Sequence, residues 1–155
     1  MLPGPNPDRI SLADVLPSCL SALAGEENRI GLAPAHRIVV ILVDGLGAAA
    51  LKARSGYARV MNAALSGSID SIFPTTTAAA LATLATGFGP GQHGLVGYSV
   101  LDAANDRVVN QRSGGDDRLD PANWQRIDTV FERMARAACA ATPASPSTPT
   151  AGGWG

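Results

Sequence analysis

The chain has 155 residues, of which 46% are hydrophobic and 16% are charged, so it is long enough for one domain with a core and too short for two. Its formal net charge of -1 comes from scattered side chains, which disfavours nucleic-acid polymers and anionic membranes as partners. Because no apolar run approaches the roughly 20 residues of a membrane span and the first residues lack a signal-peptide pattern, we expect a cytoplasmic protein without membrane contact.

The first part of the chain predicts a helical segment and then a buried strand. Apolar residues from Ile10 to Ala24 follow near-helical spacing, which Pro17 interrupts and Gly25 ends. Residues 37–43 form a continuous apolar run rich in β-branched side chains, which is typical of a strand buried on both faces of a parallel sheet. We therefore place the start of the main domain at this strand.

The next elements complete a strand, helix, strand pattern. Residues 48–65 predict a helix with a break near Ser55 and Gly56, and residues 67–73 alternate like a second strand, which Pro74 stops. This order is the βαβ unit of α/β folds. The fold class that we predict is α/β, with a mostly parallel sheet flanked by helices.

Three further elements follow before the composition of the chain changes. Residues 77–86 predict a helix that Gly87 ends, and residues 97–109 predict a peripheral hairpin with its turn at Asn105-Asp106. Residues 128–138 predict an amphipathic helix that Asp128 caps. One face of that helix would carry Val130, Phe131 and Met134.

The last residues have no charge and few large apolar side chains. After Arg136 the chain consists mainly of Ala, Thr, Pro, Ser and Gly, so residues 139–155 predict a disordered tail. The composition also fits a GC-rich gene that is read out of frame. Because a further buried strand is expected after the helix at residues 128–138, we hypothesise a frameshift or truncation near Arg136.

Asp44 follows the predicted strand at residues 37–43 directly, and Gly45 follows Asp44. The carboxyl ends of strands are where open α/β sheets bind ligands, and a carboxylate there is placed to bind a metal ion. The alternative for this residue alone is a turn or a helix cap.

Thr77 lies where the second predicted strand gives way to a helix, within Phe73-Pro74-Thr75-Thr76-Thr77. The unpaired N–H groups of a helix amino terminus stabilise anionic oxygens, and a nearby metal ion can activate a hydroxyl as a nucleophile. Three threonines before a helix are commonly caps. Because neighbouring strands end at the same edge of a sheet, we expect Thr77 to lie within reach of one cation together with Asp44.

Four segments in this order resemble the nucleotide pyrophosphatase/phosphodiesterase branch of the alkaline phosphatase superfamily: Val43-Asp44-Gly45, Phe73-Pro74-Thr75-Thr76-Thr77, Thr83-Leu84-Ala85-Thr86-Gly87 and Gly91-Gln92-His93-Gly94-Leu95-Val96. The resemblance implies an alkaline phosphatase-like fold and a small phosphoester or nucleotide substrate. It also implies that Asp44 binds one of two zinc ions and that Thr77 is a nucleophile on the same ion. His93 and Gly94 would shape a turn and bind no metal.

Two departures from the family pattern limit what this chain can do. Tyr98 stands near the place where the phosphodiesterases usually have an Asn that binds a phosphate oxygen, and it can donate one hydrogen bond there. The family's remaining Asp and His ligands come from further along a longer chain, and no His follows Val96 here. We therefore expect at most one partial zinc site and an inactive, incomplete α/β domain over residues 37–138, after an amino-terminal helical segment and linker over residues 1–36.

Two other function classes remain open. The segment from Gly45 to Ala50 fits the loose G-x-G-x-x-A fingerprint of dinucleotide-binding proteins, with Asp70 as the ribose ligand. Asp44 would then face the pyrophosphate, which is electrostatically unfavourable. The third class is a non-catalytic remnant or interaction module. Zinc content and phosphodiester hydrolysis separate the first class from the third, and cofactor binding separates the second.

Overall fold

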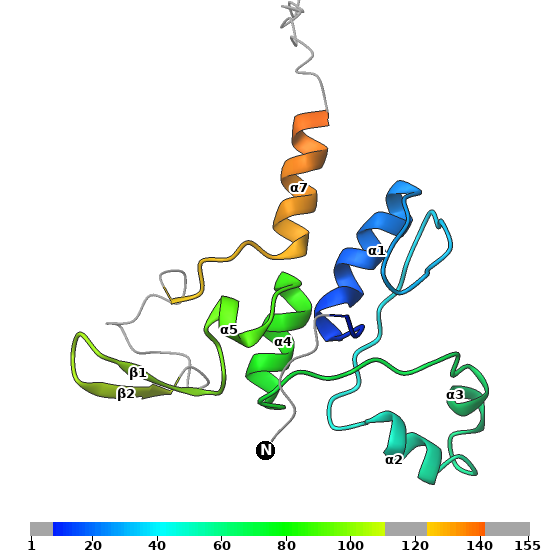
Figure 1. Ribbon diagram of the computed structural model, residues 1–155, viewed down its shortest axis with the longest axis horizontal. Helices are drawn as coiled ribbons and strands as arrows, with labels where there is room; N and C mark the ends of the chain where they lie inside the picture. The colour runs from blue at the N-terminus through cyan, green and yellow to red at the C-terminus, as the bar shows by residue number, and fades with distance from the viewer. Residues whose placement is uncertain (1–7, 111–123, 142–155) are drawn as a thin grey trace, which may run out of the picture.

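The computed structural model describes residues 8–110 and 124–141 (Figure 1). In chain order the elements are the 3₁₀ helix η1 (Leu12–Asp14), α1 (Val15–Ala24), α2 (Ala48–Ala53), α3 (Arg59–Ala63), α4 (Thr77–Thr86), α5 (Pro90–His93), β1 (Ser99–Asp102), β2 (Arg107–Asn110) and α7 (Val130–Ala141). The architecture is mixed α/β. In this part of the chain no helix has the length and apolar character needed to cross a bilayer.

The core is a small helical cluster in which α1, α4 and α7 pack against one another and η1 packs on α4 (Figure 1). Its buried side chains are small or medium in size. They come from α1 (Leu16, Cys19, Ala22), α4 (Ala79, Thr83, Thr86) and the first residue of α7 (Val130). The small alanine and threonine side chains of α4 allow the neighbouring helices to approach it closely.

The first helical segment differs from its prediction at Pro17. This residue does not interrupt α1 but lies in its first turn, where the missing N–H is of no consequence because a helix leaves its first N–H groups without intrahelical partners. The break lies earlier, where η1 meets α1. Gly25 ends α1 as predicted, with a φ of 75° that favours glycine.

The predicted break in residues 48–65 is confirmed. The helix divides into α2 and α3, and these two pack on each other (Figure 1). Neither packs on another described helix or strand to any comparable extent. This pair therefore lies apart from the helical core.

Residues 37–43, which the sequence predicts to be a buried parallel strand, are neither a strand nor buried. A strand exists only through main-chain hydrogen bonds to a neighbour, and its predicted neighbour at residues 67–73 pairs elsewhere. Asp70 of that segment exchanges main-chain hydrogen bonds of 3.0 Å with Ile10 and Leu12. The predicted mostly parallel sheet is thus not formed in the described part of the chain, whose one sheet is two-stranded and antiparallel.

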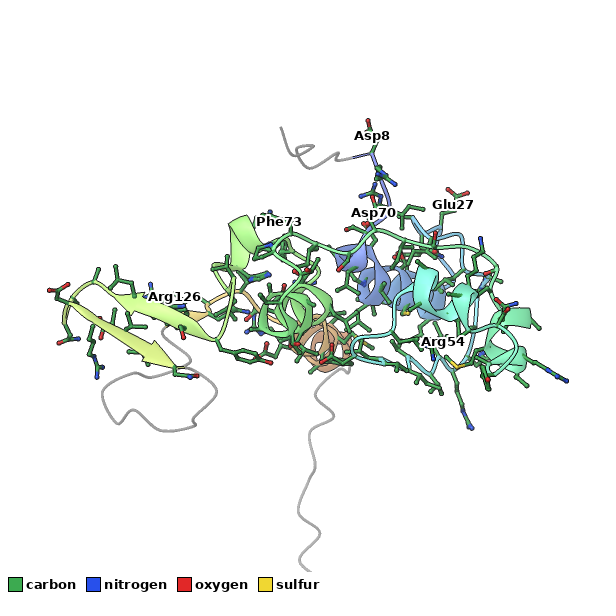
Figure 2. All side chains as sticks on the ribbon, turned by 90° about the horizontal axis from the view of Figure 1, so that it is seen from below. Asp8, Glu27, Arg54, Asp70, Phe73 and Arg126 are labelled. Carbon is green, nitrogen blue, oxygen red and sulfur yellow. The ribbon has the colours of Figure 1, made fainter. Side chains whose placement is uncertain are left out.

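The hairpin predicted at residues 97–109 is confirmed. Strands β1 and β2 pair antiparallel, and the turn contains Asp106 with a φ of 46°. Asp102 accepts hydrogen bonds from Asn105 at 2.8 Å and from Arg107 at 3.1 Å, and these two partners, Asn105 first, lower the pKa of its carboxyl. Figure 2 shows the hairpin projecting from the helices.

Helix α7 is confirmed, but its cap and its apolar face differ from the prediction. Thr129, not Asp128, caps it, because Thr129 Oγ1 accepts from the N–H of Glu132 at 3.2 Å and the Glu132 carboxylate accepts from the N–H of Thr129 at 2.7 Å. Val130 is buried, whereas Phe131 is exposed. The helix reaches Ala141, and the rest of the predicted tail, residues 142–155, lies outside the described residues.

Candidate functional site

Three consecutive threonines at the start of α4 have three different environments. Thr75 is exposed. Thr76 is the N-cap, because its hydroxyl accepts the N–H of Ala79 at 3.4 Å and donates to the carbonyl of Val96 at 2.7 Å. Thr77 is the first helical residue, and since Thr76 performs the capping, the hydroxyl of Thr77 is available for another contact.

Thr77 makes that contact with Asp44. Its Oγ1 donates a hydrogen bond to Asp44 Oδ2 at 3.2 Å, which joins two residues that are 33 positions apart. Asp44 is exposed directly after the apolar run 38–43, and Gly45 follows it with a φ of 72°. The structure thus brings together the two residues for which the sequence predicts a shared site.

The pair lies at the amino-terminal end of a ten-residue helix. The first N–H groups of a helix have no intrahelical acceptor, and Thr76 takes up only that of Ala79. The N–H groups of Thr77 and Ala78 lie at the same end and suit an anionic oxygen. The arrangement combines the Thr77 hydroxyl, the Asp44 carboxylate that orients the hydroxyl proton, and the positive end of the α4 helix dipole.

A complete zinc site is not formed by the described residues. Asp44 and Thr77 offer two oxygen donors, but a structural or catalytic zinc ion takes at least three protein ligands. No group of three His, Cys, Asp or Glu side chains that could hold a metal occurs in residues 8–110 and 124–141. The donors therefore fit part of one zinc coordination sphere and do not fit the two ions that the resemblance implies.

His93 is buried and engaged at both ring nitrogens, which agrees with the structural role expected of it. Its Nδ1 accepts the N–H of Leu95 at 3.1 Å, so Nε2 carries the proton of the neutral ring and donates to Thr83 Oγ1 at 2.9 Å. Burial lowers the pKa of His93. This histidine joins α5 to α4, and neither nitrogen is available to a metal ion.

Tyr98 is partly exposed immediately before β1. The segment that carries it is tied to α4 through Val96, whose carbonyl accepts the hydroxyl of Thr76. Thr76 is thus a site residue to which sequence reasoning gave no separate role. The signal was present, because a Thr directly before a predicted helix start has the position of an N-cap.

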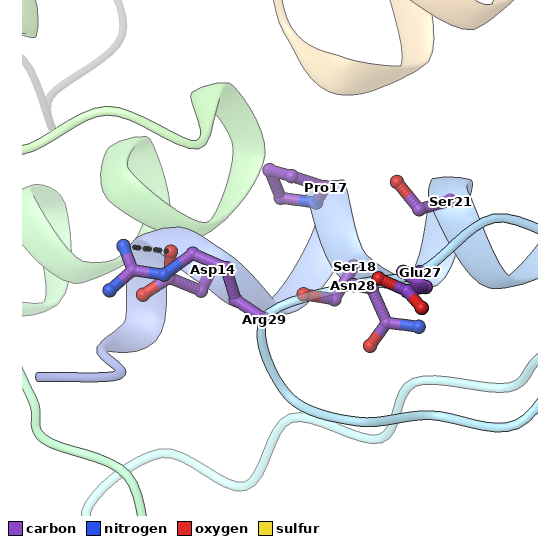
Figure 3. A pocket seen from close by; sticks show the side chains of 7 residues that line it. All are labelled: Asp14, Pro17, Ser18, Ser21, Glu27, Asn28 and Arg29. Atoms are coloured by element: carbon purple, nitrogen blue, oxygen red, sulfur yellow. Dashed lines mark hydrogen bonds and ion pairs between the residues drawn. The ribbon is translucent and has the colours of Figure 1, made fainter. Parts of the chain in front are cut away.

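An open cleft of about 370 Å³ lies elsewhere (Figure 3). It is lined by Asp14, Pro17, Ser18, Ser21, Glu27, Asn28 and Arg29. Two of these residues, Arg29 and Asp14, form an ion pair at 3.0 Å. No residue of the Asp44–Thr77 pair borders this cleft.

The family model described as type I phosphodiesterase / nucleotide pyrophosphatase matches residues 38–151. The chain belongs to this family. The match confirms the resemblance found in the sequence and implies an alkaline phosphatase-like fold for the phosphodiesterase domain. No curated protein and no solved structure matches the chain.

The dinucleotide-binding alternative relied on Asp70 as its ribose ligand. Asp70 is ion-paired to Arg9 at 2.8 Å, and its main chain pairs with Ile10 and Leu12. Membership of the phosphodiesterase family supports phosphoester chemistry instead.

Proposed function

We propose that Thr77 is the nucleophile in the hydrolysis of a phosphodiester or nucleotide pyrophosphate, and that Asp44 is its partner at the site. The observation that carries this proposal is the 3.2 Å hydrogen bond from Thr77 Oγ1 to Asp44 Oδ2 at the amino terminus of α4. Family membership supports a phosphoester substrate.

In the proposed reaction Thr77 Oγ1 forms a bond to phosphorus while the bond from phosphorus to the leaving oxygen breaks. Asp44 accepts the hydroxyl proton as the bond from Oγ1 to phosphorus forms, and the leaving oxygen departs as an anion that takes a proton from water. The N–H groups at the start of α4 stabilise the negative oxygens of the phosphoryl group. In a complete site, water would then cleave the bond between Thr77 Oγ1 and phosphorus, release the phosphomonoester product and restore the hydroxyl.

The family is typically metal-dependent, and the two zinc ions expected here need more ligands than Asp44 and Thr77 provide. We therefore propose that this chain by itself is inactive in turnover. Thr77 would react at most once, because hydrolysis of the bond between Thr77 Oγ1 and phosphorus also needs more metal ligands than the described residues provide.

The test uses an activated phosphodiester such as bis(p-nitrophenyl) phosphate with added zinc, followed by mass spectrometry of the chain. We expect a covalent p-nitrophenyl phosphoryl label on Thr77, with one p-nitrophenolate released for each label, and no sustained turnover. Thr77→Ala should carry no label, whereas Thr75→Ala, which changes an exposed neighbour, should be labelled like the wild type.

A label on Thr75 or Thr76, or no label at all, would refute the assignment of the nucleophile. Sustained turnover that is lost in Thr77→Ala would support the nucleophile and refute the proposed inactivity. A chain that neither reacts nor binds zinc would instead be the non-catalytic remnant that the sequence left open.

A further inference from the structure

A short segment, residues 93–96, is hydrogen-bonded to α4 at two points. His93 Nε2 donates to Thr83 Oγ1 at 2.9 Å in the second half of α4, and the carbonyl of Val96 accepts the hydroxyl of Thr76 at 2.7 Å at the start of α4. These two points lie about two helical turns apart. The segment, which we call the 93–96 strap, therefore spans the amino-terminal part of α4.

The ring of His93 also fixes the main chain between these two points. Its Nδ1 accepts the N–H of Leu95 at 3.1 Å, across Gly94, which has a φ of 76°. His93 and Thr83 are 3% and 0% exposed, so water has little access to the bond that anchors the ring. The position of the Val96 carbonyl is therefore set by a side chain that is itself held on α4.

Thr76 connects the 93–96 strap to the proposed nucleophile. Its hydroxyl donates to the Val96 carbonyl and accepts the N–H of Ala79 at 3.4 Å, so it links the strap to the first turn of α4. Thr77 is the next residue, and its Oγ1 lies 3.2 Å from Asp44 Oδ2. Because the two threonines share a rigid peptide unit, a displacement of Thr76 displaces Thr77 as well. A displacement of about 1 Å at a reacting group can slow a reaction by roughly 100-fold.

We infer that His93 and Thr76 are positioning residues for the hydroxyl of Thr77. Through the 93–96 strap they hold the start of α4 where this hydroxyl meets Asp44, and neither residue touches the reacting atoms. The inference rests on the proposed nucleophile for its chemical consequence, and it deepens that proposal by naming what holds the nucleophile in place. The hydrogen bonds themselves do not depend on the reaction.

Substitutions at these two positions separate the strap contact from the other contacts of the same side chain. Thr76→Asp still caps α4, but an ionised carboxylate has no hydrogen to donate to the Val96 carbonyl, whereas Thr76→Ser keeps both bonds. His93→Asn places an amide oxygen on Cγ, as Nδ1 is, within reach of the Leu95 N–H. His93→Gln places its amide one bond further out, towards Thr83, and leaves the Leu95 N–H without its acceptor.

The first test uses no reaction. It follows the backbone amide signals of Leu95 and Thr77 by heteronuclear NMR of the full chain, with far-UV circular dichroism as the check that each variant is folded. His93→Gln should shift both signals in the wild-type and Thr76→Ser backgrounds. In the Thr76→Asp background it should still shift the Leu95 signal and no longer that of Thr77.

Two outcomes of this test would overturn the inference. One is an unchanged Thr77 signal in His93→Gln, and the other is an equal shift of Thr77 in all three backgrounds. Where a double variant does not fold, the single variants at position 76 decide the question. Thr76→Asp should shift the Leu95 signal through the strap and Thr76→Ser should not, so equal effects of the two would also overturn the inference.

The second test measures the rate at which bis(p-nitrophenyl) phosphate labels Thr77. His93→Gln should slow the labelling by about tenfold or more, and His93→Asn, which keeps an acceptor for Leu95, should recover most of the rate. His36→Gln, which changes an exposed histidine, should react like the wild type. Equal rates in His93→Gln and the wild type, or equal slowing by His93→Gln and His93→Asn, would overturn the inference. If the wild type itself acquires no label, the proposed nucleophile is refuted, and the NMR test alone decides whether the strap holds Thr77 in place.

Discussion

The hydroxyl of Thr77 donates to the carboxylate of Asp44 although no sheet aligns the two residues. The contact involves Asp44, which is followed by Gly45 with a φ of 72°, and Thr77, at which α4 begins. The contact between these residues therefore depends on where two short segments, the one that ends at Asp44 and the one that begins at Thr77, lie next to each other. It does not require the complete parallel sheet that the sequence led us to expect.

The coupling between these two residues is measurable. In a double-mutant cycle with Thr77→Val and Asp44→Asn, we expect a coupling of about 0.5–1.5 kcal/mol in the free energy of unfolding, the usual net value of one hydrogen bond. Urea unfolding followed by circular dichroism gives this quantity. A cycle in which Thr75→Val replaces Thr77→Val should show no coupling with Asp44.

Thr76 should matter for stability more than either neighbour. Thr76→Ala removes the cap of the Ala79 N–H and the bond to the Val96 carbonyl, so we expect a loss of about 1–2 kcal/mol in the free energy of unfolding. Thr76→Ser keeps the oxygen and should recover most of this loss. If Thr75→Ala destabilised the chain as much as Thr76→Ala, the assignment of the cap would be wrong.

Gly87 cannot accept a side chain. Its φ is 74°, and an added Cβ would lie 2.7 Å from Pro17 Cγ and 3.4 Å from the carbonyl oxygen of Ala13. Gly87→Ala therefore strains the end of α4 and pushes α1 away, and we expect a loss of about 1–3 kcal/mol in thermal or urea unfolding. Gly91→Ala is the matched control, because Gly91 has open space around its Cβ position and no positive φ. It should leave stability almost unchanged.

The elements that were predicted correctly are those whose ends are set by residues close to them in the sequence. Thr76 and Gly87 set the two ends of α4, and the Asn105-Asp106 turn fixed the hairpin. Residues 37–43 were predicted wrongly as a strand because their apolar, β-branched composition reports only a preference. Whether such a run is a strand depends on hydrogen bonds from residues far away in the sequence, and its expected neighbour is instead bonded to Ile10 and Leu12.

In the candidate site and at the cap of α7, too, some features could be predicted from the sequence and others could not. Asp44 and Thr77 were predicted to share a site from their positions after a predicted buried strand and at a helix start, and they are in hydrogen-bond contact. The cap of α7 was assigned to Asp128 because Asp is a good cap, but the reciprocal bonds between Thr129 and Glu132 form a capping box one residue later. A choice between adjacent capping residues depends on side-chain geometry that composition does not contain.

The buried neutral His93 should make the chain less stable in mild acid. Because burial lowers the pKa of His93 in the folded state, the unfolded chain binds a proton more readily than the folded chain as the pH falls through about 6.5. Its contribution to stability is therefore complete above that pH and is lost as the pH falls through it. The loss ends below the folded-state pKa.

The measurement is the melting temperature between about pH 7.5 and 5.5, a window above the ordinary pKa values of carboxyl groups. We expect it to fall with pH in the wild type and in His36→Gln, which changes an exposed histidine. His93→Gln should flatten the profile even if it lowers stability overall. An unchanged slope in His93→Gln would show that another group causes the dependence.

Arg133 should be the most important charged residue of α7. Its guanidinium donates to the carbonyl of Thr86 at 2.8 Å and to that of Asp128 at 3.0 Å, and it lies 5.4 Å from the ring centroid of Phe88. The Thr86 carbonyl is at the negative end of α4, which a cation stabilises. One side chain thus joins the end of α4 to the start of α7.

We expect Arg133→Ala to lower the free energy of unfolding by about 1.5–3 kcal/mol, because it removes two charge-assisted hydrogen bonds and a cation–π contact. Arg133→Lys should restore only part of this, since an ammonium lacks the planar fork that reaches both carbonyls. Arg136→Ala is the matched control on the same helix. Arg136 pairs with Asp128 with its side chain 69% exposed, and such surface pairs contribute about 0–1 kcal/mol. If urea unfolding showed equal losses for Arg133→Ala and Arg136→Ala, the contact between Arg133 and the carbonyl end of α4 would not be what holds α7 in place.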